Sequence, residues 1–170
     1  MSRRNSLSRT FRHLATDHVD VRRAFPSAAL ARIEATIADG EKRHRGQLRF
    51  AVEPALPVVR VWRGVTPRER ALEAFGLMRI WDTGENCGVL VYLLLADRDV
   101  EIVADRGIHG HVGSEAWESV CRTMEAAFRD GLYAEGVEAG LAEINALLAL
   151  HYPRGAGARG NELPDRPVVL

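Results

Sequence analysis

Hydrophobic and polar positions along this chain follow two different periods, and the clearest segment predicts a β-hairpin. Residues 88–96 form an uninterrupted apolar run of strand length, rich in β-branched and aromatic side chains, which is typical of a central strand covered on both faces. Asp97, Arg98 and Asp99 supply polar turn residues, after which an apolar segment resumes at Val100. Residues 88–104 are therefore predicted to form an antiparallel hairpin.

A second strand is predicted ahead of this hairpin. Between residues 47 and 53, apolar Leu48, Phe50 and Val52 alternate with mostly polar neighbours, which indicates a strand with two unlike faces. Pro54 ends it. The β-branched segment 58–62 is predicted to add a short edge strand.

The remaining apolar positions recur with helical period. Leu30, Ile33 and Ile37 form one stripe in residues 26–44, and Thr66 followed by Pro67 is a helix start for residues 66–81. Two further helices are predicted at 114–130 and 133–150, preceded by a glycine-rich loop at 105–113. The predicted fold is a three-layer α/β/α sandwich, with a mixed sheet of three to four strands between helices.

The chain divides into three parts by composition. Residues 1–25 are basic and place Leu7, Phe11 and Leu14 at helical spacing, which predicts a short helix docked on the domain, with a membrane or partner contact as the alternative. Residues 26–152 form the folded domain. Residues 153–170 are rich in glycine and proline and are predicted to be disordered.

Charge and cysteine content narrow the classes of function. The 23 basic and 23 acidic residues balance, so no overall field favours nucleic acid. Cys87 and Cys121 lack metal-type spacing and are predicted to be buried thiols. The N-terminus lacks the apolar stretch of a secretory signal, and the longest apolar run is about half the length of a membrane-spanning helix. We therefore expect a soluble, cytoplasmic protein without a transmembrane segment.

Several motifs in a fixed order resemble the TPM domain family. They are the turn Asn86-Cys87-Gly88 before the central strand, the Asp97-Arg98 pair in the hairpin and the step Gly107-Ile108-His109-Gly110. The late segment Phe128-Arg129-Asp130-Gly131-Leu132-Tyr133-Ala134-Glu135-Gly136 resembles the family's junction between its last two helices. The resemblance covers residues 28–150.

This resemblance implies a sheet between helices and, in some members, binding of a divalent cation such as calcium. It also implies the weak acid phosphatase activity of plant members. Many bacterial members carry a signal peptide and a membrane anchor, and we expect neither here, so the resemblance is to the soluble domain alone. Two positions depart from the family's pattern, because Ala96 and His109 stand where carboxylates are usual. Losing both carboxylates removes oxygen ligands that calcium needs in number.

The predicted hairpin brings two loops to the same end of the sheet. The loop before Gly88 and the loop after Ala104 should meet beside the helix that begins at Ser114. A helix start with nearby glycines suits an anion, whereas carboxylates and imidazoles suit a cation, and the sequence does not choose between them. His109 and His111 would lie on the same side of an extended segment. The ligand-binding candidates are Asp82, Glu85, Asn86, Asp105, His109 and His111.

A second candidate cluster lies at the opposite end. If the strand at 47–53 runs parallel to the central one, Glu53, Asp97 and Asp99 come together as carboxylates that could bind a metal.

Neither cluster completes a catalytic set, and the sequence contains no Walker loop or nucleophile elbow. The leading hypothesis is a non-catalytic binding or accessory domain that acts through a protein partner. In one form of this hypothesis, the domain meets its partner at a membrane. The alternative is a divalent-metal-dependent phosphatase.

Overall fold

The chain folds as a three-layer α/β/α sandwich around one mixed sheet, as predicted from the sequence. The computed structural model describes residues 3–155 and 160–170, with side chains from residue 7 onward. The strands lie in the order β3, β2, β1, β4. Their bounds are β1 (Gln47–Glu53), β2 (Gly88–Leu94), β3 (Asp99–Ala104) and β4 (Val168–Val169).

The predicted hairpin is confirmed, and it lies beside a parallel strand. β2 pairs antiparallel with β3, with Val89 opposite Ala104, and parallel with β1 on its other side. A short 3₁₀ turn, Leu95–Asp97, closes the hairpin together with Arg98, whose φ of 53° is left-handed. The two ends of the sheet are therefore chemically distinct: one carries the hairpin turn, and the other carries the loops that enter β2 and leave β3.

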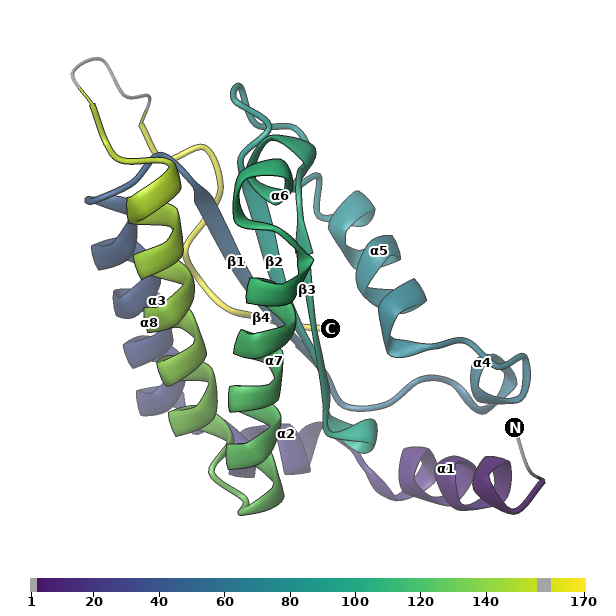
Figure 1. Ribbon diagram of the computed structural model, residues 1–170. Coiled ribbons are helices and arrows are strands. Elements are labelled where there is room, and N and C mark those ends of the chain that lie inside the picture. Colours follow the sequence, from purple (N-terminus) through teal and green to yellow (C-terminus); the bar gives the residue numbers. More distant parts are fainter. Residues whose placement is uncertain (1–2, 156–159) are drawn as a thin grey trace.

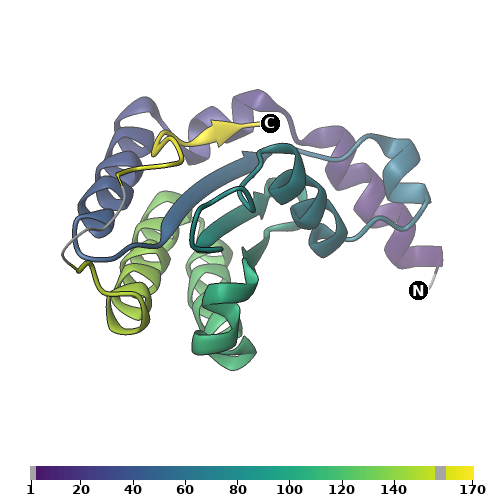
Figure 2. The same ribbon diagram turned by 90° about the horizontal axis from the view of Figure 1, so that it is seen from above.

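Helices cover both faces of the sheet (Figures 1 and 2). Helices α3, α7 and α8 cover one face, α5 covers the other, and α1 with α4 lies beyond the hairpin turn (Figure 1). The helices are α1 (Arg3–Ala15), α2 (His18–Ala24), α3 (Ser27–Glu41), α4 (Val58–Trp62), α5 (Pro67–Leu77), α6 (Arg106–Val112), α7 (Ser114–Arg129) and α8 (Tyr133–His151).

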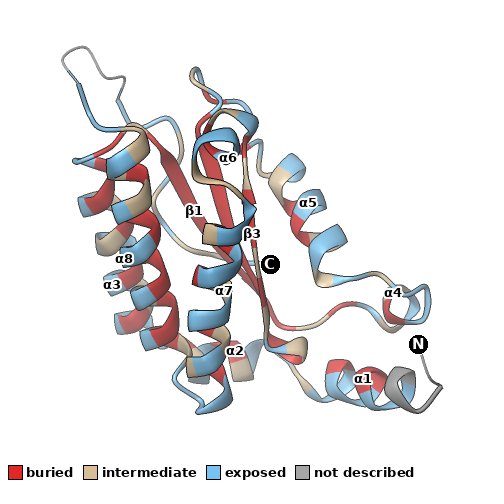
Figure 3. Ribbon diagram, viewed as in Figure 1, coloured by how far each residue is buried: buried red, intermediate tan, exposed pale blue. Residues whose placement is uncertain are grey.

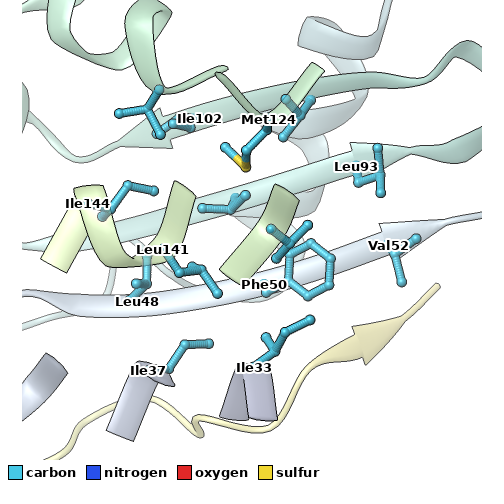
Figure 4. Close-up of a cluster of buried hydrophobic side chains, with 14 of the residues drawn as sticks. Ile33, Ile37, Leu48, Phe50, Val52, Leu93, Ile102, Met124, Leu141 and Ile144 are labelled. Carbon is cyan, nitrogen blue, oxygen red and sulfur yellow. The ribbon is translucent and has the colours of Figure 1, made fainter. Parts of the chain in front are cut away.

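Two apolar clusters fill the space between the layers. The larger one joins the inward side chains of β1 and β2 to α3, α7 and α8, with Phe50, Ile33 and Leu141 fully buried (Figure 4). The smaller one lies under α5 and includes Leu90 and Tyr92. Cys87 is buried and Cys121 half-buried, and both are free thiols, as predicted.

The polar side of β1 is covered by other parts of the chain. All seven residues of β1 are buried (Figure 3). Gln47 Oε1 accepts hydrogen bonds from the backbone N–H groups of Glu162 and Leu163, and Arg49 donates to the Pro164 carbonyl. The polar residues of β1 therefore bind other parts of the chain instead of facing water.

Residues 58–62 were predicted to form an edge strand, and this is wrong: they form helix α4. Their β-branched composition favours a strand, but Pro57 precedes the first turn, and burial of Val61 against the α5 side outweighs that preference.

The predicted loop at 105–113 is also wrong, because most of it is helix α6. Asp105 caps this helix by accepting a hydrogen bond from the Arg106 N–H group. Glycine is required within it, since a Cβ atom at Gly107 would lie 2.6 Å from the Asn86 carbonyl oxygen. Gly107 therefore permits a close approach between two segments and does not mark an irregular loop.

The tail was predicted to be disordered, and this is wrong at its C-terminal end. Val168 and Val169 pair in parallel with β1, and the Leu170 N–H group donates to the Val52 carbonyl. Leu163, Val168 and Leu170 pack on the smaller apolar cluster, which offsets the cost of ordering them. Residues 156–159 of this prediction lie outside the described residues.

Candidate functional site

The two loops predicted to meet at one end of the sheet do meet. Gly107 of α6 approaches the carbonyl oxygens of Glu85 and Asn86 closely, and the Asp105 N–H group donates to the Gly88 carbonyl at 2.8 Å. Asn86 itself has a left-handed φ of 51°, a conformation that asparagine tolerates better than most residues. This end of the sheet is thus a tightly packed backbone junction.

The side chains at this junction point to separate partners and do not form one site. Asp82 pairs with Arg79 on the surface, Glu85 pairs with Arg45 at 2.6 Å, and Asp105 is occupied as a helix cap. Asp105 Oδ2 is buried and has no hydrogen-bond partner among the described residues.

The two histidines diverge because their segment is helical. Residues two apart on a helix lie on different faces, whereas the prediction assumed an extended segment. His111 packs edge-on against the ring of Tyr152, with centroids 5.6 Å apart. His109 instead lines a groove beside β3 and α7. The prediction that the two imidazoles lie on the same side of their segment is therefore wrong, and they do not face a common ligand.

At the other end, Asp97 is enclosed by three basic side chains of α1. Arg9 approaches it with Nη2 at 2.8 Å, Arg12 with Nη2 at 3.2 Å, and His13 with Nε2 at 3.2 Å in a geometry short of a hydrogen bond. His13 Nδ1 accepts a hydrogen bond from the Leu56 N–H group, so a neutral ring carries its proton on Nε2, facing Asp97.

These contacts determine the charge state of Asp97. Burial alone raises the pKa of this carboxyl, but the neighbouring His13 and Arg9 outweigh burial and hold the pKa below its usual range. Asp97 is therefore a carboxylate at neutral pH, and the arginines of its own chain occupy the positions around it.

Glu53 and Asp99 do not join Asp97 in a metal site. Glu53 accepts hydrogen bonds from Arg70 Nε at 2.8 Å and from the Tyr92 hydroxyl at 2.7 Å. Asp99 lies in the groove beside β3, where burial and then the neighbouring carboxylates raise its pKa to about 6. Within residues 3–155 and 160–170, no three His, Cys, Asp or Glu side chains converge as metal ligands would.

The most distinctive surface is the outer face of α1. This helix docks through Arg9, Thr10 and His13, while its apolar residues Leu7, Phe11 and Leu14 are 61%, 70% and 65% exposed. The sequence pattern identified these three residues as a stripe, but it suggested the opposite orientation for the docked helix.

Trp62 is a further exposed apolar residue, and it lies on a helix that contacts α1. It is 69% exposed on α4, and α4 packs on α1 (Figure 1). We call Leu7, Phe11, Leu14 and Trp62 the α1/α4 surface. In the part of the chain that the structure describes, no helix is both long and apolar enough to cross a bilayer.

Comparison with known proteins agrees with the observed fold. The family model described as the TPM domain matches residues 18–147. Among solved structures, the NMR structure of the BA42 protein from the psychrophilic bacterium Bizionia argentinensis is similar with a TM-score of 0.76. The two sequences are 23% identical, and the match covers 86% of this chain and 95% of that one, so the likeness shows the fold alone. No curated protein matches the chain.

Proposed function

Because this chain belongs to the TPM domain family, we propose that it is a non-catalytic binding domain of that family and acts through a protein partner. The observation that carries this proposal is the orientation of α1. The helix uses its polar face to dock on its own domain and leaves its apolar face uncovered.

The apolar face of α1 is exposed although the helix itself is firmly docked on the domain. Arg9 and Asp97 form a largely buried ion pair, with side chains 10% and 9% exposed, so the helix is held in a defined orientation. In this orientation Leu7, Phe11 and Leu14 remain in contact with water, so the domain does not gain the free energy that burial of these side chains would give. A partner that covers these side chains would gain that free energy on binding.

The chemistry of the α1/α4 surface fits a protein more closely than a lipid bilayer. Phe11 and Trp62 are aromatic anchors of the kind that dominate protein interfaces. Exposed Arg12 lies at the margin of the stripe and would form part of a polar rim. We therefore expect a partner with an apolar groove that accepts one helix.

The rival function is a divalent-metal-dependent phosphatase. It would use the loops at the end of the sheet opposite the hairpin turn, yet Asp82 and Glu85 there are paired with Arg79 and Arg45. The carboxylates at the hairpin end are no freer, because Asp97 and Glu53 are paired with Arg9 and Arg70 of the same chain. A cation would have to displace a guanidinium at each position, which costs part of the binding energy.

Site-directed variants of the α1/α4 surface test the proposal. The double variant Phe11→Asp and Leu14→Asp should abolish specific photo-crosslinking from α1 to the partner in cells, because charged side chains cannot enter an apolar groove. Leu150→Asp, at a leucine 72% exposed on α8, is the matched control and should leave the crosslink intact.

Three results would contradict the binding function. One is a crosslink that survives the double variant. Another is sedimentation of the purified protein with anionic vesicles in the absence of any partner. The third is hydrolysis of p-nitrophenyl phosphate that depends on calcium, magnesium, manganese or zinc, together with a thermal shift caused by the same ion.

A further inference from the structure

A groove of about 530 Å³ runs along β3, which is the outer strand of the sheet. Its floor is the strand itself. Trp117, Cys121 and Glu125 of α7 form one wall, and Arg68 of α5 lies on the other side. Figure 2 shows β3 at this edge, between α7 and α5. The groove is separate from the α1/α4 surface.

The backbone of β3 directs N–H and C=O groups toward this groove as well as toward β2. In an antiparallel ladder, alternate residues direct their N–H and C=O groups to the partner strand and away from it. Asp105 donates to Gly88 of β2, so Val100 and Ile102 belong to the outward set. Arg68 confirms this alternation, because its Nη1 donates to the Ile102 carbonyl at 2.6 Å.

The groove is acidic, and part of its charge is uncompensated. Its carboxylates are Asp99, Glu101, Glu118 and Glu125, against the guanidinium groups of Arg68 and Arg122. Arg68 and Arg122 pair with Glu101 and Glu118, but Asp99 and Glu125 form no ion pair within the described residues. A cationic ligand would relieve the repulsion among these carboxylates.

A buried indole group provides an independent observation. Trp117 is 4% exposed, and its Nε1–H group has no hydrogen-bond partner among the described residues. An unpaired buried donor is unfavourable, because it has lost its hydrogen bonds to water and gained none in the protein. A ligand carbonyl entering the groove would provide the acceptor that this donor lacks.

We propose that this groove binds an extended, basic peptide segment, which adds to β3 as a further strand. Such a segment supplies a backbone that pairs with Val100, carbonyl oxygens for Trp117, and cationic side chains for Asp99 and Glu125. A metal ion or a polyamine supplies the charge but neither a carbonyl nor a strand.

Titration calorimetry with a blocked peptide of alternating arginine and valine tests this inference. We expect saturable binding that weakens about tenfold in the double variant Asp99→Asn and Glu125→Gln, since two attractive charges are lost. Glu115→Gln, on the same helix but outside the groove, should bind the peptide like the wild type. Arg68→Ala should tighten binding by about threefold, because it frees the Ile102 carbonyl.

Amide hydrogen exchange distinguishes strand addition from simple charge attraction. Bound peptide should slow exchange at the outward amide of Val100, while the inward amide of Glu101 remains as it was. Absence of binding, equal binding of a glutamate–valine peptide, or spermine binding as tight as the peptide would overturn the proposal. So would unchanged exchange at Val100.

This inference does not rest on the α1/α4 surface. The double variant Phe11→Asp and Leu14→Asp should therefore bind the arginine–valine peptide as the wild type does. The two proposals can fail separately.

Discussion

Asp97 links the N-terminal helix to the sheet through charge. Its carboxylate contacts Arg9, Arg12 and His13, which lie more than eighty positions earlier in the chain. The Arg9 Nη2 group also donates to the Val65 carbonyl at 2.9 Å, so the guanidinium joins the hairpin turn to the segment before α5. Removing either charge of the Arg9–Asp97 pair would leave the other buried without its counterion.

We predict that Asp97→Asn lowers the free energy of unfolding by about 2–4 kcal/mol, because the buried Arg9 guanidinium loses its counterion. Urea denaturation measures this change. Arg23→Gln is the control, since it breaks the exposed pair with Asp20 and should change stability by about 0.5 kcal/mol at most. A smaller loss for Asp97→Asn than for Arg23→Gln would show that the pair does not stabilise α1.

At this scale, the sequence identified polar residues but not their partners. It placed Glu53, Asp97 and Asp99 at one end of the sheet, which the parallel pairing of β1 and β2 supports. It could not reveal that Arg9 and Arg70 would neutralise two of them, because ion pairs between distant segments leave no local pattern.

Single elements were predictable where one physical signal dominated. The strand at the apolar run of β2 and the helix start at Thr66 are both present as expected. Thr66 caps α5 in a capping box with Glu69. Helices α4 and α6 were missed because local composition conflicted with tertiary contacts. The valines of α4 suggested a strand, and the glycines of α6 suggested a loop, although Gly107 is required by the close approach of Asn86.

The pairing of α7 with α8 depends on a glycine. A Cβ atom at Gly136 would lie 2.8 Å from Ala127 Cβ and 3.3 Å from the Met124 carbonyl oxygen. Neither neighbour can rotate away, since one belongs to a short side chain and the other to the backbone. The two helices therefore pack at a distance that only glycine permits at this position.

Gly136→Ala should accordingly lower the free energy of unfolding by about 1–3 kcal/mol through overpacking. Gly76→Ala serves as the opposite control, because that exposed α5 position has open space around it. It should gain up to about 1 kcal/mol from helix propensity. Thermal or chemical denaturation of both variants measures the difference. Equal effects of the two substitutions would contradict close packing between α7 and α8.

Over the whole molecule, buried carboxyls give stability a dependence on pH with two opposing slopes. Burial raises the pKa of Glu41 to about 7 and that of Asp99 to about 6. Since the folded state then retains protons that the unfolded state releases, stability falls as pH rises through that range. Asp97 acts in the opposite sense: its pKa is lowered, so its contribution is lost in acid.

We predict that Glu41→Gln flattens the decline in stability between about pH 5 and about pH 7, and stabilises the protein by about 1–2 kcal/mol at about pH 8. Glutamine keeps an oxygen to accept the Leu48 N–H hydrogen bond that Glu41 Oε1 accepts at 2.9 Å. Urea midpoints measured across this pH range test the prediction. An unchanged slope in the variant would mean that Glu41 ionises at its ordinary pKa in the folded protein.

The largest discrepancy between sequence and structure at this scale is the C-terminal segment. Its glycines and prolines suggested disorder, yet Val168 and Val169 extend the sheet and Leu163 helps to cover it. Two paired residues are too short a strand to leave a recognisable alternation. Val168 and Val169 are ordered because β1 has a free edge on the side away from β2. This edge exists only in the assembled domain, so the segment's own sequence does not reveal it.

The pairing of β4 has a practical consequence for handling the protein. The Leu170 amide is bonded to Val52, so an affinity tag fused directly after Leu170 would start against the central sheet. A tag without a spacer would compete with the pairing of Val168 and Val169 to β1. A spectroscopic label attached after Leu170 would be sensitive to whether this pairing is intact.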